Sequence, residues 1–181
     1  MSRLAVVDEK SNPELAATYA HITKTRGHVS NILKSFSNAP EGLKRLTAFG
    51  EYARYHSDFP HRVRELVILT IARGNQYAWT HHYPNAIEAG VTDAEMNAIN
   101  ASEPVKTTSP AEAIAMQYAR EFCNRGNVSD ATFAELKKHY SARQITDLTL
   151  LTAYYLTLGS TINAFRIELE PHYTPKMKPI P

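Results

Sequence analysis

The chain has 181 residues, of which 20 are basic and 18 acidic, giving a formal net charge of +2. So balanced a charge, without a long basic run interleaved with aromatic residues, argues against nucleic acid or a membrane surface as a partner. The length suffices to bury roughly two thirds of the unfolded surface. We therefore predict a single domain over residues 1–181.

Cysteine and apolar patterns indicate the compartment. Cys123 is the single cysteine, so the chain forms no internal disulfide and gives no sign of an oxidising environment. Its setting within AREFCNRG predicts a partly buried helical thiol. No signal-like apolar run opens the sequence, and charges interrupt every apolar stretch well before 18 residues. We expect a soluble, cytoplasmic protein.

The first predicted helix begins at Asn12, a capping residue that is followed by a proline in the first turn, and runs to about Lys24. A short helix to Phe36 follows. Residues 40–56 form an amphipathic pattern that predicts the next helix. Gly50 in its middle indicates a close helix crossing, and Tyr52 is a candidate for substrate contact, although tyrosines pack cores at least as often.

The central stretch is RVRELVILTIARGNQYAWTHHYPNAIEA, residues 62–89. Its first part is apolar almost all round and predicts a buried helix, with Gly74 and Asn75 forming the stop and turn. If the two helices form an antiparallel hairpin, Glu65 and His82 can approach each other. Trp79 lies three residues before His82, which predicts that both share one face.

Adjacent histidines suggest a metal, but His81 and His82 point about 100° apart on a helix and cannot both face one ion unaided. No HExxH pattern is present either. We therefore predict no metal site. The sequence also lacks a glycine-rich phosphate loop and a nucleophile elbow.

Later elements follow clear start signals. Capping boxes begin three further helices, with the pairs Thr92 and Glu95, Ser109 and Glu112, and Ser141 and Gln144. The last of these helices is predicted to break near Gly159. We expect the proline-containing tail, residues 172–181, to be extended and able to clasp another subunit.

The central stretch resembles the carboxymuconolactone decarboxylase family, which includes the alkylhydroperoxidase D-like proteins. The matching letters are RELVIL, YAWTHH, Ala86 and AGVT. The resemblance implies an all-α, alkylhydroperoxidase D-like helical bundle with a central helical hairpin. It also implies functional roles for Glu65 and His82, with Tyr77 and Trp79 lining the site. Asn75 and Ala78 stand where the peroxidase branch has its cysteine pair, so that branch's redox chemistry is not expected.

A possible internal duplication accompanies the resemblance. Setting RVRELVILTIA against RQITDLTLLTA pairs Arg62 with Arg143 and, after a shift of one residue, Leu66 with Leu148. The resemblance implies a second hairpin that keeps the packing and lacks the histidine motif. Any two buried helices can produce so short a match.

The resemblance implies a cofactor-independent, carboxymuconolactone decarboxylase-like enzyme that acts on a small carboxylated lactone or aromatic-derived acid. In that interpretation His82 manages the proton, and Glu65 holds His82 or acts beside it. Arg64 pairs with Glu65 or with the substrate carboxylate, and His81 is a further substrate-binding candidate. The alternatives are a non-catalytic helical oligomer that binds a small ligand, and an antioxidant peroxidase, disfavoured without CxxC. A lone buried histidine is more often a core residue. The resemblance also implies trimers or hexamers.

Overall fold

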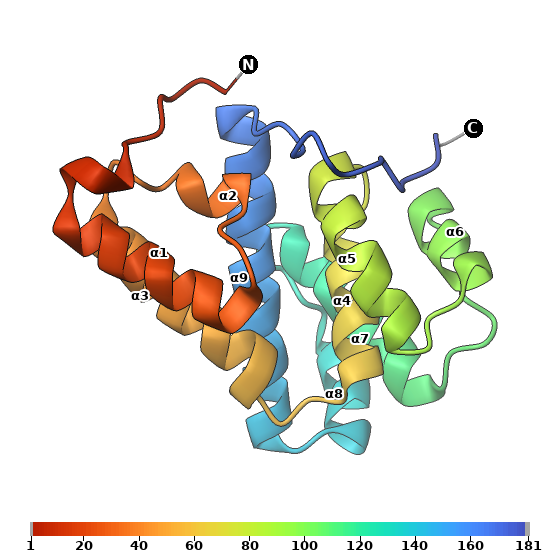
Figure 1. The fold of residues 1–181 in the computed structure, drawn as a ribbon. Helices are drawn as coiled ribbons and strands as arrows, with labels where there is room; N and C mark the ends of the chain where they lie inside the picture. Colours follow the sequence, from red (N-terminus) through yellow and green to blue (C-terminus); the bar gives the residue numbers. More distant parts are fainter. Residues whose placement is uncertain (1, 180–181) are drawn as a thin grey trace.

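The computed structural model describes residues 2–179, and every regular element within them is helical (Figure 1). In chain order the elements are η1 (Glu9–Ser11), α1 (Pro13–Arg26), α2 (Asn31–Lys34), α3 (Pro40–Glu51), η2 (Tyr52–His56), α4 (His61–Ala72), α5 (Gln76–Glu88), α6 (Asp93–Ala101), α7 (Pro110–Cys123), α8 (Asp130–His139) and α9 (Ala142–Phe165). The prediction of an all-α bundle is confirmed.

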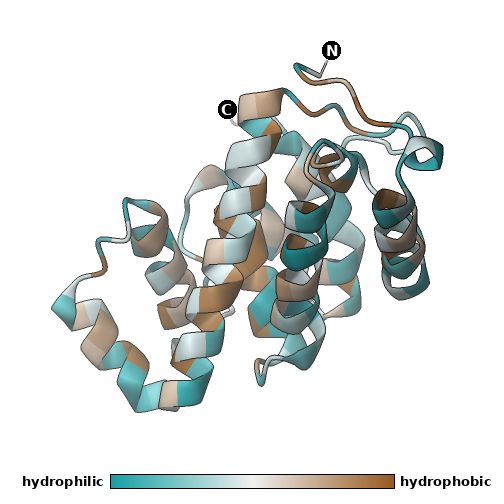
Figure 2. Ribbon diagram, turned by 90° about the vertical axis from the view of Figure 1, so that its left-hand side faces the viewer, coloured by the Kyte–Doolittle hydropathy of each residue, from teal (hydrophilic) through white to brown (hydrophobic). Residues whose placement is uncertain are grey.

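Helix α4 lies at the centre of the fold and packs against α5, α7 and α9 (Figure 1). Eight of its twelve residues are buried, as expected for a helix that is apolar almost all round. Figure 2 shows hydrophobic residues concentrated on the inner helices, while the peripheral turns are mostly hydrophilic. None of the helices in residues 2–179 is long and apolar enough to cross a membrane.

The hairpin of α4 and α5 forms as the sequence predicts. Gly74 takes a φ of 76° in the turn, a conformation that glycine adopts without strain. The side chain of Asn75 then caps α5 by accepting a hydrogen bond from the Ala78 amide. A short turn between antiparallel helices brings the first turn of α4 close to the middle of α5.

Helix α3 continues into η2, a π-helical turn at Tyr52–His56 in which the amide of Ser57 donates to the carbonyl of Tyr52. Single π-turns of this kind are frequent at functional sites. The predicted close crossing at Gly50 is confirmed, because the Tyr154 ring of α9 lies so near that an added Cβ would be 2.2 Å from its hydroxyl.

The three predicted capping boxes are all present, at the starts of α6, α7 and α9. The predicted break near Gly159 is wrong, since α9 runs unbroken from Ala142 to Phe165 and ends where Arg166 takes a left-handed conformation. A mid-helix glycine costs only about 1 kcal/mol. Packing of α9 against α4 and α7 outweighs that cost.

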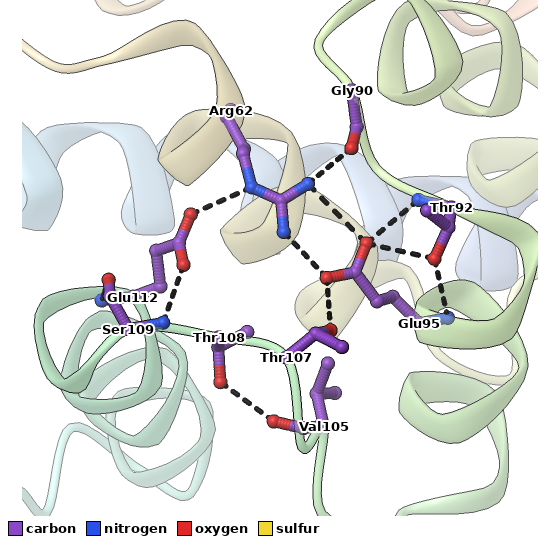
Figure 3. Close-up of polar contacts among 9 residues, drawn as sticks. All are labelled: Arg62, Gly90, Thr92, Glu95, Val105, Thr107, Thr108, Ser109 and Glu112. Carbon is purple, nitrogen blue, oxygen red and sulfur yellow. Dashed lines mark hydrogen bonds and ion pairs between the residues drawn. The ribbon is translucent and has the colours of Figure 1, made fainter.

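A closed polar network joins the starts of α4, α6 and α7 (Figure 3). The Arg62 guanidinium donates to Glu95 at 2.6 Å, to Glu112 at 2.8 Å and to the carbonyl of Gly90. Burial alone raises the pKa of Glu95, but hydrogen bonds from Arg62 and Thr107 outweigh it and hold the pKa at about 2. Every charged group in the network has a partner, so its role is structural.

After α9 the chain crosses α5 and reaches α6 (Figure 1). The amide of Lys176 donates to the Thr80 hydroxyl at 3.1 Å, and the Asn100 side chain donates to the carbonyl of Lys178 at 2.8 Å. Residues 174–179 have no regular structure. The part of the tail that the structure describes thus packs on its own chain, and its contact with another subunit stays a prediction. Residues 180 and 181 lie outside the described range.

Candidate active site

The hairpin brings together the two residues that the sequence singled out. His82 on α5 and Glu65 on α4 are joined by a 2.9 Å contact between the imidazole Nδ1 and the carboxylate Oε2. Both are buried, with 1% of Glu65 and 7% of His82 exposed. The predicted approach of these side chains is therefore confirmed in the fold.

The protonation state of this pair follows from its surroundings. Burial raises the pKa of Glu65, but the charge and hydrogen bond of His82, with Arg54 and Arg64, outweigh it and leave the pKa below its usual range. Burial is the main cause that lowers the pKa of His82. Near neutral pH the carboxylate is thus ionised and the imidazole neutral. Nδ1 carries the proton that is shared with Glu65, which leaves Nε2 with a free lone pair.

A cavity of about 380 Å³ adjoins the pair, bounded by the end of α1, by α2 and η2, and by α5 and α9. His82 lines it, while Glu65 lies behind the imidazole. The edge of one ring meets the face of the other between His82 and Tyr155 of α9, with centroids 5.0 Å apart. Nε2 has no hydrogen-bond partner in residues 2–179. A carboxylate-oriented imidazole with one open nitrogen at a cavity can exchange a proton with a bound ligand.

A second histidine–carboxylate pair stands at the edge of the same cavity. His81 Nε2 contacts Glu170 at 2.8 Å, and Glu170 also accepts hydrogen bonds from the hydroxyl of Tyr77 and the amide of Asn31. Burial opposes ionisation of Glu170, but these partners lower its pKa to about 2. The carboxylate links α2 and α5 to the chain after α9, so it fixes the cavity wall.

Tyr77 and His81 line the cavity, as the sequence predicted for substrate-binding residues. Sequence reasoning missed Glu170, because nothing local marks it and it lies 89 residues beyond His81. Their roles toward a substrate stay predictions.

Trp79 does not line the cavity, which corrects the expectation from its spacing to His82. Its side chain is 2% exposed and belongs to a core cluster with Leu66, Met96 and Met116. The physical reason is that α5 is buried on two sides. Trp79 shares the core stripe with Ala86, whereas the cavity stripe carries both histidines.

Arg64 and Tyr52 also lie outside the cavity lining. Arg64 Nε forms an ion pair with the Oε1 of Glu65 at 3.9 Å, which is one of the two pairings that the sequence predicted for it. The Tyr52 hydroxyl donates instead to the buried carboxylate of Asp147 on α9 at 2.7 Å. The expectation that these two residues contact the substrate is not supported by the geometry.

The cavity lining includes residues that the sequence analysis did not select, above all Arg54 on η2 and Tyr155 on α9. The hydroxyl of Tyr155 is buried without a hydrogen-bond partner. Its pKa is raised, chiefly by burial. A π-helical turn has no clear sequence signature, and residues from distant helices meet only in the folded chain.

Within the described residues, no group of three or more histidine, cysteine or acidic side chains could hold a metal ion. Cys123 is half-buried on α7, burial raises its pKa, and it does not line the cavity. The predicted duplication stays a prediction. Glu65 and Asp147 are both buried carboxylates of packed helices, but Asp147 meets a tyrosine hydroxyl and the Asp58 amide in place of a histidine.

Fold and site together define a class: an all-α protein whose central helical hairpin places a histidine–carboxylate pair at a cavity. Comparison with known proteins is consistent with this class. The model of the carboxymuconolactone decarboxylase family matches residues 40–121, from the start of α3 into α7. Residues 40–121 thus match the carboxymuconolactone decarboxylase family, and the fold is that of alkylhydroperoxidase D-like structures. A search of curated proteins found no match.

Solved structures show the same fold at low identity. A cysteine-to-alanine variant of the debrominase Bmp8, in complex with 2,3,4-tribromopyrrole, is 15% identical with a TM-score of 0.77, over 94% of this chain and 95% of that one. An uncharacterised peroxidase-related protein from Ralstonia eutropha JMP134, described as an alkylhydroperoxidase AhpD core, is 16% identical with a TM-score of 0.77, over 97% and 98%. A peroxidase-related protein from Silicibacter sp. TM1040 is 16% identical, with a TM-score of 0.76, over 95% and 93%.

Proposed function

We propose that this protein is a cofactor-independent acid–base enzyme that decarboxylates a small carboxylated lactone or aromatic-derived acid. The observation that carries the proposal is the His82–Glu65 pair, with its open Nε2 at the cavity. The family match supports the reaction class, and the volume of about 380 Å³ suits a small ligand.

In the proposed reaction the bond between the substrate carbon and its carboxylate breaks, and carbon dioxide leaves. The bonding electrons pass into the adjacent carbonyl system as an enolate. A proton taken up from solvent by Nε2 of His82 is then delivered to the carbon, which restores the neutral imidazole. Glu65 holds Nδ1 and stabilises the imidazolium that forms in between. The partly apolar surroundings favour the step in which the negative charge leaves the carboxylate.

Thiol chemistry at this cavity has no support. The single cysteine of the chain, Cys123, is outside the lining and has a raised pKa, which reduces its thiolate fraction. Asn75, at the position of the peroxidase branch's first cysteine, caps α5 with its side chain. Dehalogenation and peroxide reduction that need a cavity thiolate are therefore less favoured than acid–base chemistry.

The test is a screen of carboxylated lactones and aromatic acids for carbon dioxide release by wild-type protein and by folded His82→Ala and Glu65→Gln variants. We expect release from at least one compound, and its loss in both variants. If compounds bind but none reacts, the protein is the non-catalytic ligand-binding alternative and the decarboxylase proposal fails. Association into trimers or hexamers remains a prediction, which sedimentation of the purified protein tests.

A further inference from the structure

The charge of the cavity lining is one-sided. Arg26 and Arg54 line it together with His28, His81 and His82, and no aspartate or glutamate does so in the described chain. Glu65 and Glu170 do not line it, and each is already hydrogen-bonded to a histidine that does. A cavity with cations at its surface and carboxylates withdrawn behind them attracts an anion.

Arg54 is the cation without a partner. Its guanidinium packs over the Tyr55 ring at 5.2 Å, and it makes no hydrogen bond or ion pair with any described residue. Its pKa is raised, chiefly by Tyr155, with Glu65 contributing. The same arginine lowers the pKa of His82. Arg54 thus lies within electrostatic reach of the catalytic pair without neutralising it.

Other polar groups around the cavity are also unsatisfied. The Nε of Arg26 is buried without a partner, and its Nη2 has only a long 3.5 Å contact to the carbonyl of Thr47. Tyr155 is 6% exposed and its hydroxyl is unpaired. Buried donors left open cost stability, and clusters of them call for an explanation. A bound anion supplies the missing acceptor oxygens.

We propose that Arg54, presented by the π-helical turn η2, is the residue that recognises the carboxylate of the ligand, with Arg26 as a second cation of the same cavity and Tyr155 as an adjacent donor. Guanidinium groups bind carboxylates through two parallel hydrogen bonds. The inference rests on the proposed function for its choice of a carboxylate. It replaces Arg64, which the sequence suggested for this role but which does not reach the cavity.

The experiment measures binding by calorimetry for benzoate and a five-membered lactone carboxylate, each beside its neutral carboxamide, with inorganic phosphate as a third probe. Wild-type protein should bind at least one carboxylate and bind its carboxamide far more weakly. In Arg54→Gln the carboxylate Kd should rise about ten- to a hundredfold, as for loss of a charged hydrogen bond. The carboxamide Kd should change little.

Two further variants keep the test decisive if Arg54→Gln fails to fold. Arg54→Lys retains the charge without the planar fork, so it should still prefer carboxylate over carboxamide, with weaker binding. Tyr155→Phe should weaken carboxylate binding by a smaller factor. The control is Arg45→Gln on α3, which removes the same charge from a side chain that is 79% exposed and paired with Glu41. It should bind like wild type.

The inference is overturned if no carboxylate binds, if carboxamides bind equally well, if only phosphate binds, or if Arg54→Gln binds carboxylates as tightly as wild type. Its failure is distinct from failure of the proposed function. Arginine-dependent binding without carbon dioxide release would support the carboxylate site and refute the decarboxylase, whereas release that is insensitive to Arg54 would do the opposite.

Discussion

The network around Arg62 and the lining of the cavity use the same kinds of side chain in opposite ways. Arg62 has an acceptor at each guanidinium nitrogen, and its partner Glu95 is itself fully engaged (Figure 3). Among residues 2–179, Arg54 packs over the Tyr55 ring but has no hydrogen bond or ion pair, the Tyr155 hydroxyl has no partner, and one nitrogen of His82 is open. Satisfied polar groups hold helices together, whereas open ones at a cavity are available to a ligand.

The largest effect should come from the open group at the centre of the cavity. We expect His82→Gln to lower turnover about 10²- to 10⁴-fold, the range that positioned proton transfer contributes. Thermal unfolding should show that the variant stays folded. The matched control is His21→Gln, because His21 forms a contact of the same 2.9 Å length with Glu51 on the surface. Equal turnover losses in the two variants would contradict the comparison.

Breaking the closed network should act on stability instead. Glu95→Ala leaves Arg62 with one carboxylate, Glu112. We therefore expect the free energy of unfolding to fall by about 2–3 kcal/mol. This is less than the loss expected when a buried charge loses its only partner. Urea denaturation measures this. Glu41→Ala removes an ion pair of the same 2.6 Å length from an exposed site and should change stability little. Carboxylate binding should be unaffected in both.

The pH dependence of turnover distinguishes the pair from a buried histidine of structural function. Because burial lowers the pKa of His82 from its ordinary 6.5, the imidazolium that delivers the proton forms only below pH 6.5, so turnover should rise on acidification below that pH. Glu65 raises this pKa, so in Glu65→Gln the titration of His82, followed by NMR, should move to still lower pH. Stability changes in the opposite sense: the unfolded chain takes up the proton first, so acidification below pH 6.5 weakens the folded state. A rise in turnover centred above pH 6.5 would contradict the assignment.

We expect the smallest effect on stability from removing a hydroxyl that has no hydrogen-bond partner and packs against a neighbouring helix. The Tyr154 hydroxyl has no partner and lies against Gly50. Tyr154→Phe should therefore leave the free energy of unfolding unchanged or raise it by up to about 1 kcal/mol, since no hydrogen bond is lost. Thermal unfolding detects the change. A clear loss of stability would mean that the hydroxyl has a partner, and the distinction between open and closed groups would need revision.

Most of the fold could be predicted from the sequence because the signals for helix starts and buried faces are local. Capping residues, first-turn prolines and apolar periodicity depend on neighbours within a few positions, and they located nearly every helix start. Gly159 shows the limit, because long-range packing keeps α9 intact where local propensity predicts a break.

The site was only half predictable for the same reason. Glu65 and His82 belong to one hairpin, so spacing alone could bring them together. Arg54 lines the cavity from a π-helical turn, and Glu170 holds His81 from a segment beyond α9; neither has a local pattern. The prediction for Trp79 was wrong because sequence spacing gives the angle between two side chains around a helix. It does not tell which of the two buried sides of α5 faces the cavity.

The most direct test of the account is nitrogen NMR of the His82 imidazole, assigned by comparison with His82→Gln and titrated with and without a bound carboxylate. We predict a neutral ring protonated at Nδ1 at neutral pH, a pKa below 6.5, and an Nε2 resonance that shifts when the ligand binds. A ring that remains charged at neutral pH, or one whose Nε2 does not respond to any bound carboxylate, would contradict the central claim that His82 presents a base to the cavity.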